Sequence, residues 1–392
     1  MARQWTCGFE LQTFATGIEV DSNSGTPVIS TTTVRSGLAS MRVQGTGVSK
    51  FFTQQFLGTG STTNKFVRFY IRIAAAVAAG PSAVGLLRDA TNGNGPSIRV
   101  NTNNTLELWD EQAGVQRGSD SSALSANTWY RVEFQYIRGT GVITAFLDGV
   151  QFATGASTTN MSMDTFRLGM IDTTNLDFFF DDIGINDSSG TSQTGLPGDA
   201  KVIRLSPDAA GDANGFLVQV GGTAGSANNF TRVNEITPND ATSYNATAVL
   251  ATEDLFNCDA SGIGASDTVN VVSVGFRFAN IVAADATASI KIEVEKTSAG
   301  TKTQSAAIIP NSTTWRSNVP GTTLPKTYPL ITYTDPDGAA WTQATLDTMQ
   351  IGYVLFAALT RAIGVTTIWT YVDYTPNAGT TWPGYFGFGG WF

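Results

Sequence analysis

The stretch Lys65–Ile73, KFVRFYIRI, alternates between two sets of side chains, and this alternation decides the fold class. Successive side chains of a β-strand point to opposite faces, so a period of two predicts a strand with one buried and one solvated face. The segments 131–136 and 289–296 alternate in the same way, and long helical patterns are absent from the sequence. The sequence therefore predicts an all-β protein built from half-buried antiparallel strands. In the first strand the core-facing residues would be Val67, Phe69, Ile71 and Ile73, and the solvated ones Phe66, Arg68, Tyr70 and Arg72.

Turn-forming residues separate the predicted strands. Asp148-Gly149 lies between two apolar segments and predicts a type I′ hairpin, because both residues accept positive φ angles. Asp335-Pro336-Asp337-Gly338 is a second strong turn signal, and Thr342 is expected to cap one short helix, Thr342–Gln350. The apolar segment Ile351–Val372 is interpreted as two buried strands joined at 360–364, because its central Arg361 would be costly inside a bilayer.

Composition excludes several functions. The chain has 392 residues, with 23 Lys+Arg against 32 Asp+Glu, a net charge of −9 and 0 His. Without histidine, no Ser-His-Asp or Cys-His nucleophile and no His-containing zinc site can form. An acidic chain without a basic block is a poor nucleic-acid ligand. The N-terminus lacks the apolar core of a signal peptide, and we expect a soluble protein that contacts neither nucleic acid nor membrane.

One segment marks the domain boundary. Residues 187–199, DSSGTSQTGLPGD, contain almost no side chain able to join a core and are predicted to be a linker. It would separate a first domain, residues 1–186, from a second, residues 200–375, with residues 376–392 as a C-terminal arm. Cys7 and Cys258 fall in different domains; a reduced pair is favoured, and a single bridge stays an alternative.

The first domain resembles a known family. The segment Trp129–Gly149, a Trp-Tyr opening followed by two strands and Asp-Gly, is similar to laminin-G/concanavalin A-like sandwiches. Leu176–Asp187 looks like the closing strand of that family, and Cys7–Phe14 like its first strand. The resemblance covers about residues 5–187 and implies a two-sheet jelly roll. We expect a second β-sandwich in the other domain.

A second likeness concerns the whole chain. Gly198–Pro207, Val233–Tyr244 and Thr334–Gly352 follow one another as in structural proteins of tailed-bacteriophage virions that carry an N-terminal laminin-G-like domain. This resemblance implies a non-enzymatic virion component, most simply a capsid-exterior decoration or fibre-like protein that assembles in the host cytoplasm. Its partners would be other virion proteins and copies of itself, as a homo-oligomer. The alternative is a lectin-like carbohydrate-binding module, or a tail-associated protein for host attachment, with a glycan as ligand.

Acidic residues supply two candidate sites. Some concanavalin-like folds are glucanases, which need two carboxylates close together. The nearest carboxylate run here is Glu107, Asp110 and Glu111, and its spacing places Glu107 and Asp110 on opposite strand faces. We therefore interpret these residues as solvated edge charges. No cofactor is expected, with calcium as the alternative. Its weak candidate ligands are Asp172, Asp181 and Asp182, although alternation puts Asp181 and Asp182 on opposite faces.

Aromatic residues supply two more candidates. Trp5, Trp109, Trp129 and Tyr130 could stack on sugars, although Trp129 is expected to fill core at the start of its strand. The C-terminal segment 382–392, WPGYFGFGGWF, holds six aromatic residues and four glycines. It either folds back on its own domain or docks on a neighbouring subunit, and we favour docking because uncharged aromatic clusters characterise interface cores. The contact residues would be Trp382, Tyr385, Phe386, Phe388, Trp391 and Phe392.

Overall fold

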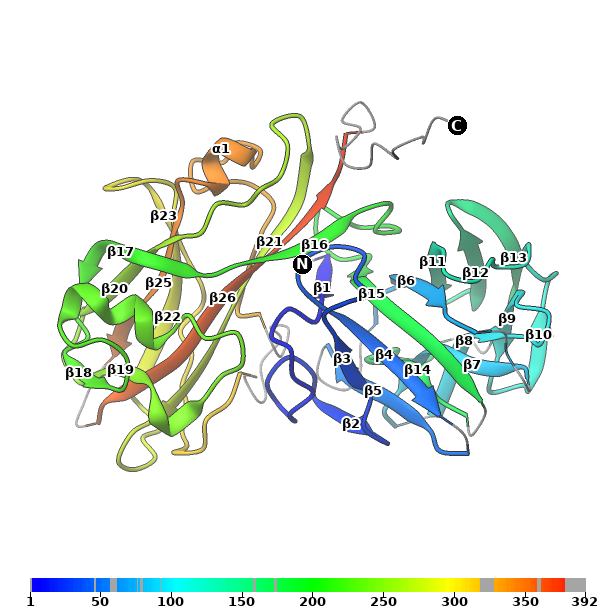
Figure 1. Cartoon of the computed structure of the whole chain (residues 1–392), viewed down its shortest axis with the longest axis horizontal. Coiled ribbons are helices and arrows are strands. Elements are labelled where there is room, and N and C mark those ends of the chain that lie inside the picture. The colour runs from blue at the N-terminus through cyan, green and yellow to red at the C-terminus, as the bar shows by residue number, and fades with distance from the viewer. Residues whose placement is uncertain are drawn as a thin grey trace, which may run out of the picture.

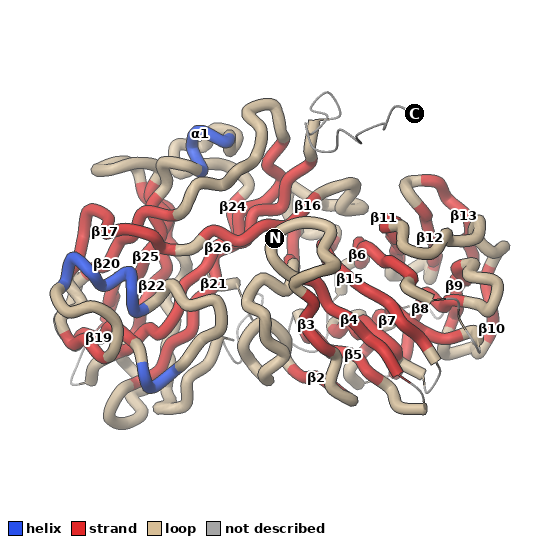
Figure 2. Tube along the Cα trace, viewed as in Figure 1, coloured by secondary structure: helices blue, strands red, loops and turns tan. Residues whose placement is uncertain are grey.

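The computed structural model describes residues 2–45, 47–56, 62–75, 77, 80–91, 93–157, 160–172, 175–317, 328–357 and 361–377, except for the side chain of residue 241. Strands dominate this part of the chain, and they form two halves that lie side by side (Figures 1 and 2). The predicted all-β class with β-sandwich architecture is confirmed. Below, the first half means residues 2–187 and the second half residues 200–377.

The first half holds two sheets. Sheet 1 has eight strands in the order β13 (Val150–Ala156), β12 (Val142–Leu147), β11 (Trp129–Ile137), β6 (Lys65–Ile73), β15 (Leu176–Asp187), β4 (Ser40–Gly45) and β3 (Val28–Ser30), with β1 (Arg3–Cys7) also paired to β15. Sheet 2 has seven strands in the order β10 (Val115–Arg117), β9 (Leu106–Asp110), β8 (Gly93–Val100), β7 (Ser82–Asp89), β14 (Thr165–Met170), β5 (Lys50–Gln55) and β2 (Ser22–Ser24). Phe69 of sheet 1 and Phe166 of sheet 2 meet between them with ring centroids 6.3 Å apart.

The second half repeats this arrangement. Sheet 3 has six strands in the order β18 (Val218–Val220), β19 (Tyr244–Thr247), β26 (Ile363–Thr375), β21 (Thr268–Asn280) and β24 (Leu330–Thr332), with β16 (Lys201–Leu205) also paired to β26. Sheet 4 has five strands in the order β17 (Pro207–Asn214), β20 (Glu253–Cys258), β25 (Gln350–Ala357), β22 (Ser289–Glu295) and β23 (Lys302–Gln304). Buried side chains from both sheets form one core. The helices are short: η1 (Ser226–Arg232), η2 (Asp240–Thr242) and α1 (Gln343–Leu346).

The structure agrees with most of the local elements predicted from the sequence. Strand β6 has the predicted limits, and Asp148 and Gly149 between β12 and β13 both have positive φ angles, 50° and 85°. Thr342 caps α1 and accepts a hydrogen bond from the Thr345 amide, although the helix is shorter than predicted. The segment Ile351–Val372 contributes to β25 and β26, which lie in different sheets. In the described part of the chain, no helix is long and apolar enough to cross a membrane.

The predicted solvated face of β6 is wrong. Phe66, Arg68 and Tyr70 on that face are buried, and only Arg72 is half-buried. The reason is tertiary: Arg68 donates hydrogen bonds to the Gly198 carbonyl and to Asp373, so residues remote in sequence cover this part of sheet 1. In the same way, the predicted solvated face of β22 is buried at Glu293 and Glu295.

A buried charge cluster joins the halves. One carboxylate oxygen of Asp373, in β26, lies 2.7 Å from guanidinium nitrogens of both Arg3 and Arg68, and all three side chains are fully buried. Burial alone would raise the pKa of Asp373, but the two arginines hold it well below its usual range. The cluster therefore fixes β26 against β1 and β6 of the first half.

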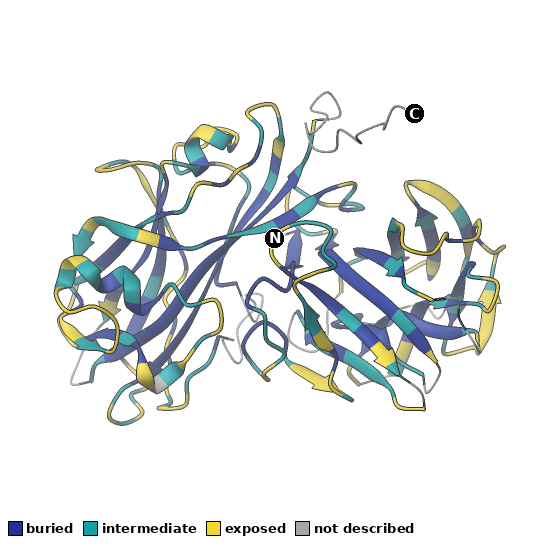
Figure 3. Ribbon diagram, viewed as in Figure 1, coloured by how far each residue is buried: buried dark blue, intermediate teal, exposed yellow. Residues whose placement is uncertain are grey.

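Apolar packing extends this contact. Tyr328, Trp369 and Tyr371 of the second half belong to the same buried cluster as the core of the first half. The Tyr371 hydroxyl and the Cys7 thiol both donate to Glu19 Oε1, at 2.5 and 2.9 Å. The two halves therefore share buried residues at their contact. Figure 3 shows buried strands of both halves at the centre of the molecule.

Candidate functional site

An open pocket of about 340 Å³ lies on the outer face of sheet 1, the face turned away from the core of the first half. Its walls combine two guanidinium groups, two aromatic rings and two carboxylates. The lining residues are Arg35, Tyr70, Trp129, Arg131, Asp148 and Asp199.

Strand register brings the base of the pocket together. In the antiparallel pair β6–β11, Arg131 lies opposite Tyr70, and Trp129 lies opposite Arg72. Residues two apart on a strand share a face, so these four side chains form a compact group on the outer face. The intervening residue Tyr130 points the other way and packs against the core.

One wall of the pocket is a closed set of polar contacts. The guanidinium carbon of Arg35 lies 3.3 Å from the centre of the Tyr70 ring, and Arg35 Nη2 lies 3.1 Å from Asp199 Oδ1. The Tyr70 hydroxyl donates a hydrogen bond to the same carboxylate. Partial burial opposes ionisation of Asp199, but the Tyr70 hydroxyl and the charges of Arg35 and Arg131 hold its pKa below the usual range. Asp199 is thus an ionised acceptor whose side chain is 58% exposed.

The opposite wall is formed by the hairpin turn. The Arg131 backbone amide donates to Asp148 Oδ1 at 2.8 Å, which holds the carboxylate beside the strand. Arg131 Nε lies 3.2 Å from Glu133 Oε2, while Glu133 Oε1 accepts from the Gly198 amide. Within the described parts of the chain, the two outer nitrogens of Arg131 have no hydrogen-bond acceptor. They are available to a ligand in the pocket.

Trp129 is the aromatic element of this site, and its predicted place in the core is wrong. Its side chain is half-buried and lines the pocket. Val132 and Phe134 of the same strand are buried and therefore define its inward face. Trp129 lies three residues before Val132, an odd number, so it is on the outward face.

The other three candidate aromatics do not line the pocket. Trp5 is fully buried in the core, 5.5 Å from the ring of Phe52. The Trp109 indole donates to Glu107 and carries the Arg99 guanidinium 4.5 Å from its ring centre, on sheet 2. The Tyr130 hydroxyl accepts from the Ser125 amide. Trp109 therefore offers a matched aromatic control on the other sheet.

The carboxylate run at the end of β9 pairs with other groups of the protein. Glu107 and Asp110 are buried, so their interpretation as solvated edge charges is wrong. Each is paired: Glu107 accepts from Asn101 and Trp109, and Asp110 lies 3.1 Å from Arg117. Glu111 accepts two hydrogen bonds from Arg99. These pairings leave the carboxylates engaged with protein donors.

Asp181 and Asp182 do act together, which the alternation argument denied. A bulge at Asp181–Gly184, with Asp182 at φ 50°, breaks the strand period. Asp181 Oδ2 accepts from the Arg35 amide at 2.9 Å, and Asp182 Oδ2 lies 2.5 Å from Arg35 Nη1. Burial, with the neighbouring Asp182 charge, raises the pKa of Asp181. Both carboxylates thus position the turn that carries Arg35.

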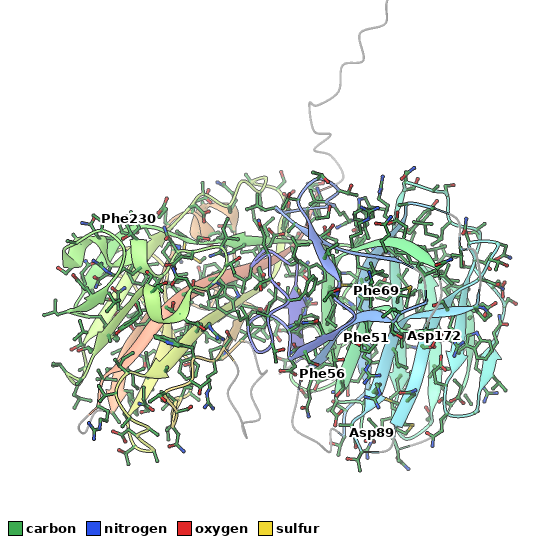
Figure 4. All side chains as sticks on the ribbon, turned by 60° about the horizontal axis from the view of Figure 1, so that its bottom comes forward. Phe51, Phe56, Phe69, Asp89, Asp172 and Phe230 are labelled. Carbon is green, nitrogen blue, oxygen red and sulfur yellow. The ribbon has the colours of Figure 1, made fainter. Side chains whose placement is uncertain are left out.

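Asp172 stands apart from this pair. It lies just after β14 of sheet 2, where Figure 4 labels it, and accepts a hydrogen bond from the Ala83 amide of β7. Among the described residues, no group of three or more Cys, Asp or Glu side chains is arranged to hold a metal ion.

Two further predictions concern the cysteines and the arm. Cys7 and Cys258 are both buried free thiols. Burial raises the pKa of each thiol, with the nearby Glu19 contributing at Cys7 and Asp259 at Cys258. The proposed contact residues of the arm lie outside the described residues; they are Trp382, Tyr385, Phe386, Phe388, Trp391 and Phe392.

Sequence reasoning missed most of the pocket. Arg35 lies in a turn between β3 and β4, and Asp199 lies in the predicted linker, so neither belongs to a motif. Two local signals pointed to it: the Asp148-Gly149 turn, which placed Asp148 at the end of the hairpin, and Trp129, named as a candidate for stacking on sugars. The predicted linker is itself packed, because its Gly198 and Gly195 hydrogen-bond to Glu133 and Asn186 of the first half.

Comparison with known proteins gives one family match. Residues 31–176 match the family described as SO2946-like, C-terminal domain, which is less than half of the chain. No curated protein matches the chain.

Solved structures give similarities of low score. The cellulose induced protein Cip1 is 18% identical with a TM-score of 0.37, and the match covers 50% of this chain and 99% of that one. The binding domain of botulinum neurotoxin serotype D is 9% identical with a TM-score of 0.34, covering 47% and 48%. Alginate lyase AlgAT5 from polysaccharide lyase family 7 is 13% identical with a TM-score of 0.31, covering 38% and 79%. Because these TM-scores lie below 0.5, the likenesses carry no argument about function.

Proposed function

We propose that this chain is a non-enzymatic structural component of a phage virion, placed on the capsid exterior as a decoration or fibre-like subunit. The sequence likeness of Gly198–Pro207, Val233–Tyr244 and Thr334–Gly352 to virion proteins supports the proposal. The observation in the structure that agrees with it is the Arg3–Asp373–Arg68 cluster between the halves. A subunit that presents one surface to a particle and another to solvent needs its two sandwiches held in a fixed relation.

Mass spectrometry of purified virions, with copy number, tests this proposal. A copy number that is a multiple of the capsid symmetry supports a decoration, whereas a small number supports a tail-associated part. Failure to find the chain in particles that package DNA normally would contradict the proposal.

A truncation tests how the subunit attaches. A variant that ends at Asn377 keeps the contact of the Asn377 amide with Asp267 Oδ1, at 2.9 Å, and all of β26. We expect it to fold with an unchanged unfolding midpoint but to be lost from particles. Normal incorporation of this variant would exclude the arm as the subunit contact.

The second candidate function is glycan binding by the first half, and the pocket is the observation that favours it. A half-buried indole beside two carboxylates and a guanidinium with unused donors suits a polyhydroxylated ring, which stacks through its apolar face and hydrogen-bonds at its edge. Its volume of about 340 Å³ lies at the lower end of the roughly 300–1,000 Å³ typical of ligand pockets. The pocket would therefore hold one or two sugar units.

A glycan array with the intact chain tests this function. We expect saturable binding that is lost in Trp129→Ala and retained in Trp109→Ala, the matched control on sheet 2. Binding to no glycan of a broad array, or equal losses in both variants, would count against a glycan site in this pocket.

A further inference from the structure

We propose that the pocket selects a carboxylated sugar, a pyranose ring bearing one negative charge such as a uronic acid residue. This inference rests on the glycan-binding function proposed above and adds the chemical class of the ligand. Its basis is the unequal way in which the arginines of this face are neutralised.

Arg35 is already neutralised by the protein. Its guanidinium lies 2.5 Å from Asp182 and 3.1 Å from Asp199, and it stacks on Tyr70. Arg42, farther along the same face, forms two hydrogen bonds with Asp177, at 2.9 and 2.8 Å. Both arginines therefore help to build the face, and neither has a charge to spare for a ligand.

Arg72 and Arg131 differ from these two. Arg72 lies 5.4 Å from the Phe179 ring and, in the described portion of the chain, forms no ion pair. Arg131 Nε pairs with Glu133 and its charge also acts on Asp199, but in the described residues no acceptor lies at its two outer nitrogens. In a chain with nine more acidic than basic side chains, a described guanidinium without an ion pair, Arg72, beside one with unused outer donors, Arg131, is unexpected.

These two arginines flank the stacking ring. Arg72 is the cross-strand neighbour of Trp129, and Arg131 follows Trp129 by two residues on the same strand face. Diagonal positions of this kind are about 7–8 Å apart, so both guanidiniums can reach one ligand stacked on the indole. Gly149 leaves room for the Arg131 guanidinium, because a Cβ at that position would lie only 2.5 Å from Arg131 Nη2.

The acidic residues of the rim limit the charge of the ligand. Asp148 offers its second carboxylate oxygen, and Asp199 is ionised and exposed, so both accept hydrogen bonds from hydroxyl groups and repel multiply charged anions. A phosphate ester with two negative charges would meet both carboxylates. A ring with one carboxylate and several hydroxyls matches the arrangement, with the carboxylate against the outer nitrogens of Arg131 and hydroxyls toward Asp148 and Asp199.

The test is an array of glycans that each carry a single uronic acid residue, printed beside the corresponding carboxyl methyl esters, followed by titration calorimetry on methyl galacturonoside and its methyl ester. The ester keeps the ring and the hydroxyls but removes the charge. We expect the free acid to bind at least about tenfold more tightly than the ester, because a hydrogen bond to a charged group is the stronger kind. We expect R131Q and R72Q to abolish this preference, and R131K to keep part of it.

Arg167→Gln is the matched control, because Arg167 also carries its guanidinium over a ring, 4.9 Å from Phe51, but on sheet 2. All variants should keep the unfolding midpoint of the parent chain, and any that does not is replaced by the milder R131K or by R72K. Equal binding of acids and esters overturns the charge selection and leaves glycan binding standing. Binding to no member of either series overturns both. A loss in Arg167→Gln equal to that in R131Q would place the acid preference outside this pocket.

Discussion

Replacing Asp373 by asparagine is the sharpest test of how the two halves are joined. The substitution keeps the size of the side chain and its hydrogen bond from the Asn270 amide group, but it removes the charge that Arg3 and Arg68 share. Two guanidinium groups are then left without their counter-ion in a site where all three side chains are fully buried.

The magnitude follows from that burial. Removing one member of a buried ion pair costs about 3–5 kcal/mol, because an uncompensated charge remains out of water. Since both arginines depend on this one carboxylate, we expect a loss in the upper part of that range. Lys296–Asp337 is the matched control, because Asp337 is 47% exposed, and its replacement by asparagine should cost at most about 1 kcal/mol.

Urea unfolding, followed by tryptophan fluorescence, measures the loss at pH 7. The pKa of Asp373 is lowered in the folded chain, so its contribution is complete above the unfolded value of about 3.9 and is lost as the pH falls below it. The gap between the parent chain and D373N should therefore narrow in acid. A loss no larger than that of D337N, or a gap that widens in acid, would refute the argument from a buried charge cluster.

Three further predictions concern stability. Burial raises the pKa of Glu10 to about 9. Between pH 4.5 and pH 9 the free energy of unfolding of the parent chain should therefore fall by about 1.4 kcal/mol per pH unit relative to that of Glu10→Gln. Unfolding at pH 5, 7 and 8.5 checks this, and the same pH dependence in both proteins would contradict it. Gly169 has φ 131°, and a Cβ there would lie 2.4 Å from the Lys50 carbonyl, so Gly169→Ala should lower the thermal midpoint clearly more than Gly139→Ala, where nothing lies within 4 Å. Thr342→Ala removes the cap of α1 and should cost about 1 kcal/mol in urea, whereas no loss would show that the helix needs no cap.

The parts of the fold that could be predicted are those fixed by local chemistry. Strand β6 and the Asp148-Gly149 hairpin depend on alternation and on φ preferences, which neighbouring residues determine. The outer face of β6 could not be predicted, because the groups that bury Arg68 come from Gly198 and Asp373, 130 and 305 residues away.

The candidate site was hidden for two physical reasons. A bulge at Asp182 interrupts the alternation of the strand. Strict alternation placed Asp181 and Asp182 on opposite faces, so it could not predict that both carboxylates contact Arg35. The other reason is that Asp199 comes from a segment whose composition indicates a spacer. A segment poor in core residues can still carry a site when its backbone is held by a neighbouring sheet.

The pocket and the junction between the halves depend on the same residues. Arg35 contacts Asp199 in the pocket wall and Asp182 behind it, and Asp182 Oδ1 also accepts from the amide of Val202, in the first strand of the second half, at 2.6 Å. A fragment limited to residues 1–186 would lack both Asp199 and Val202, so Arg35 would keep one carboxylate partner of two, and the Tyr70 hydroxyl would lose its acceptor. Absence of binding by that fragment would therefore say little about the pocket, and the intact chain is the molecule in which a ligand has to be sought.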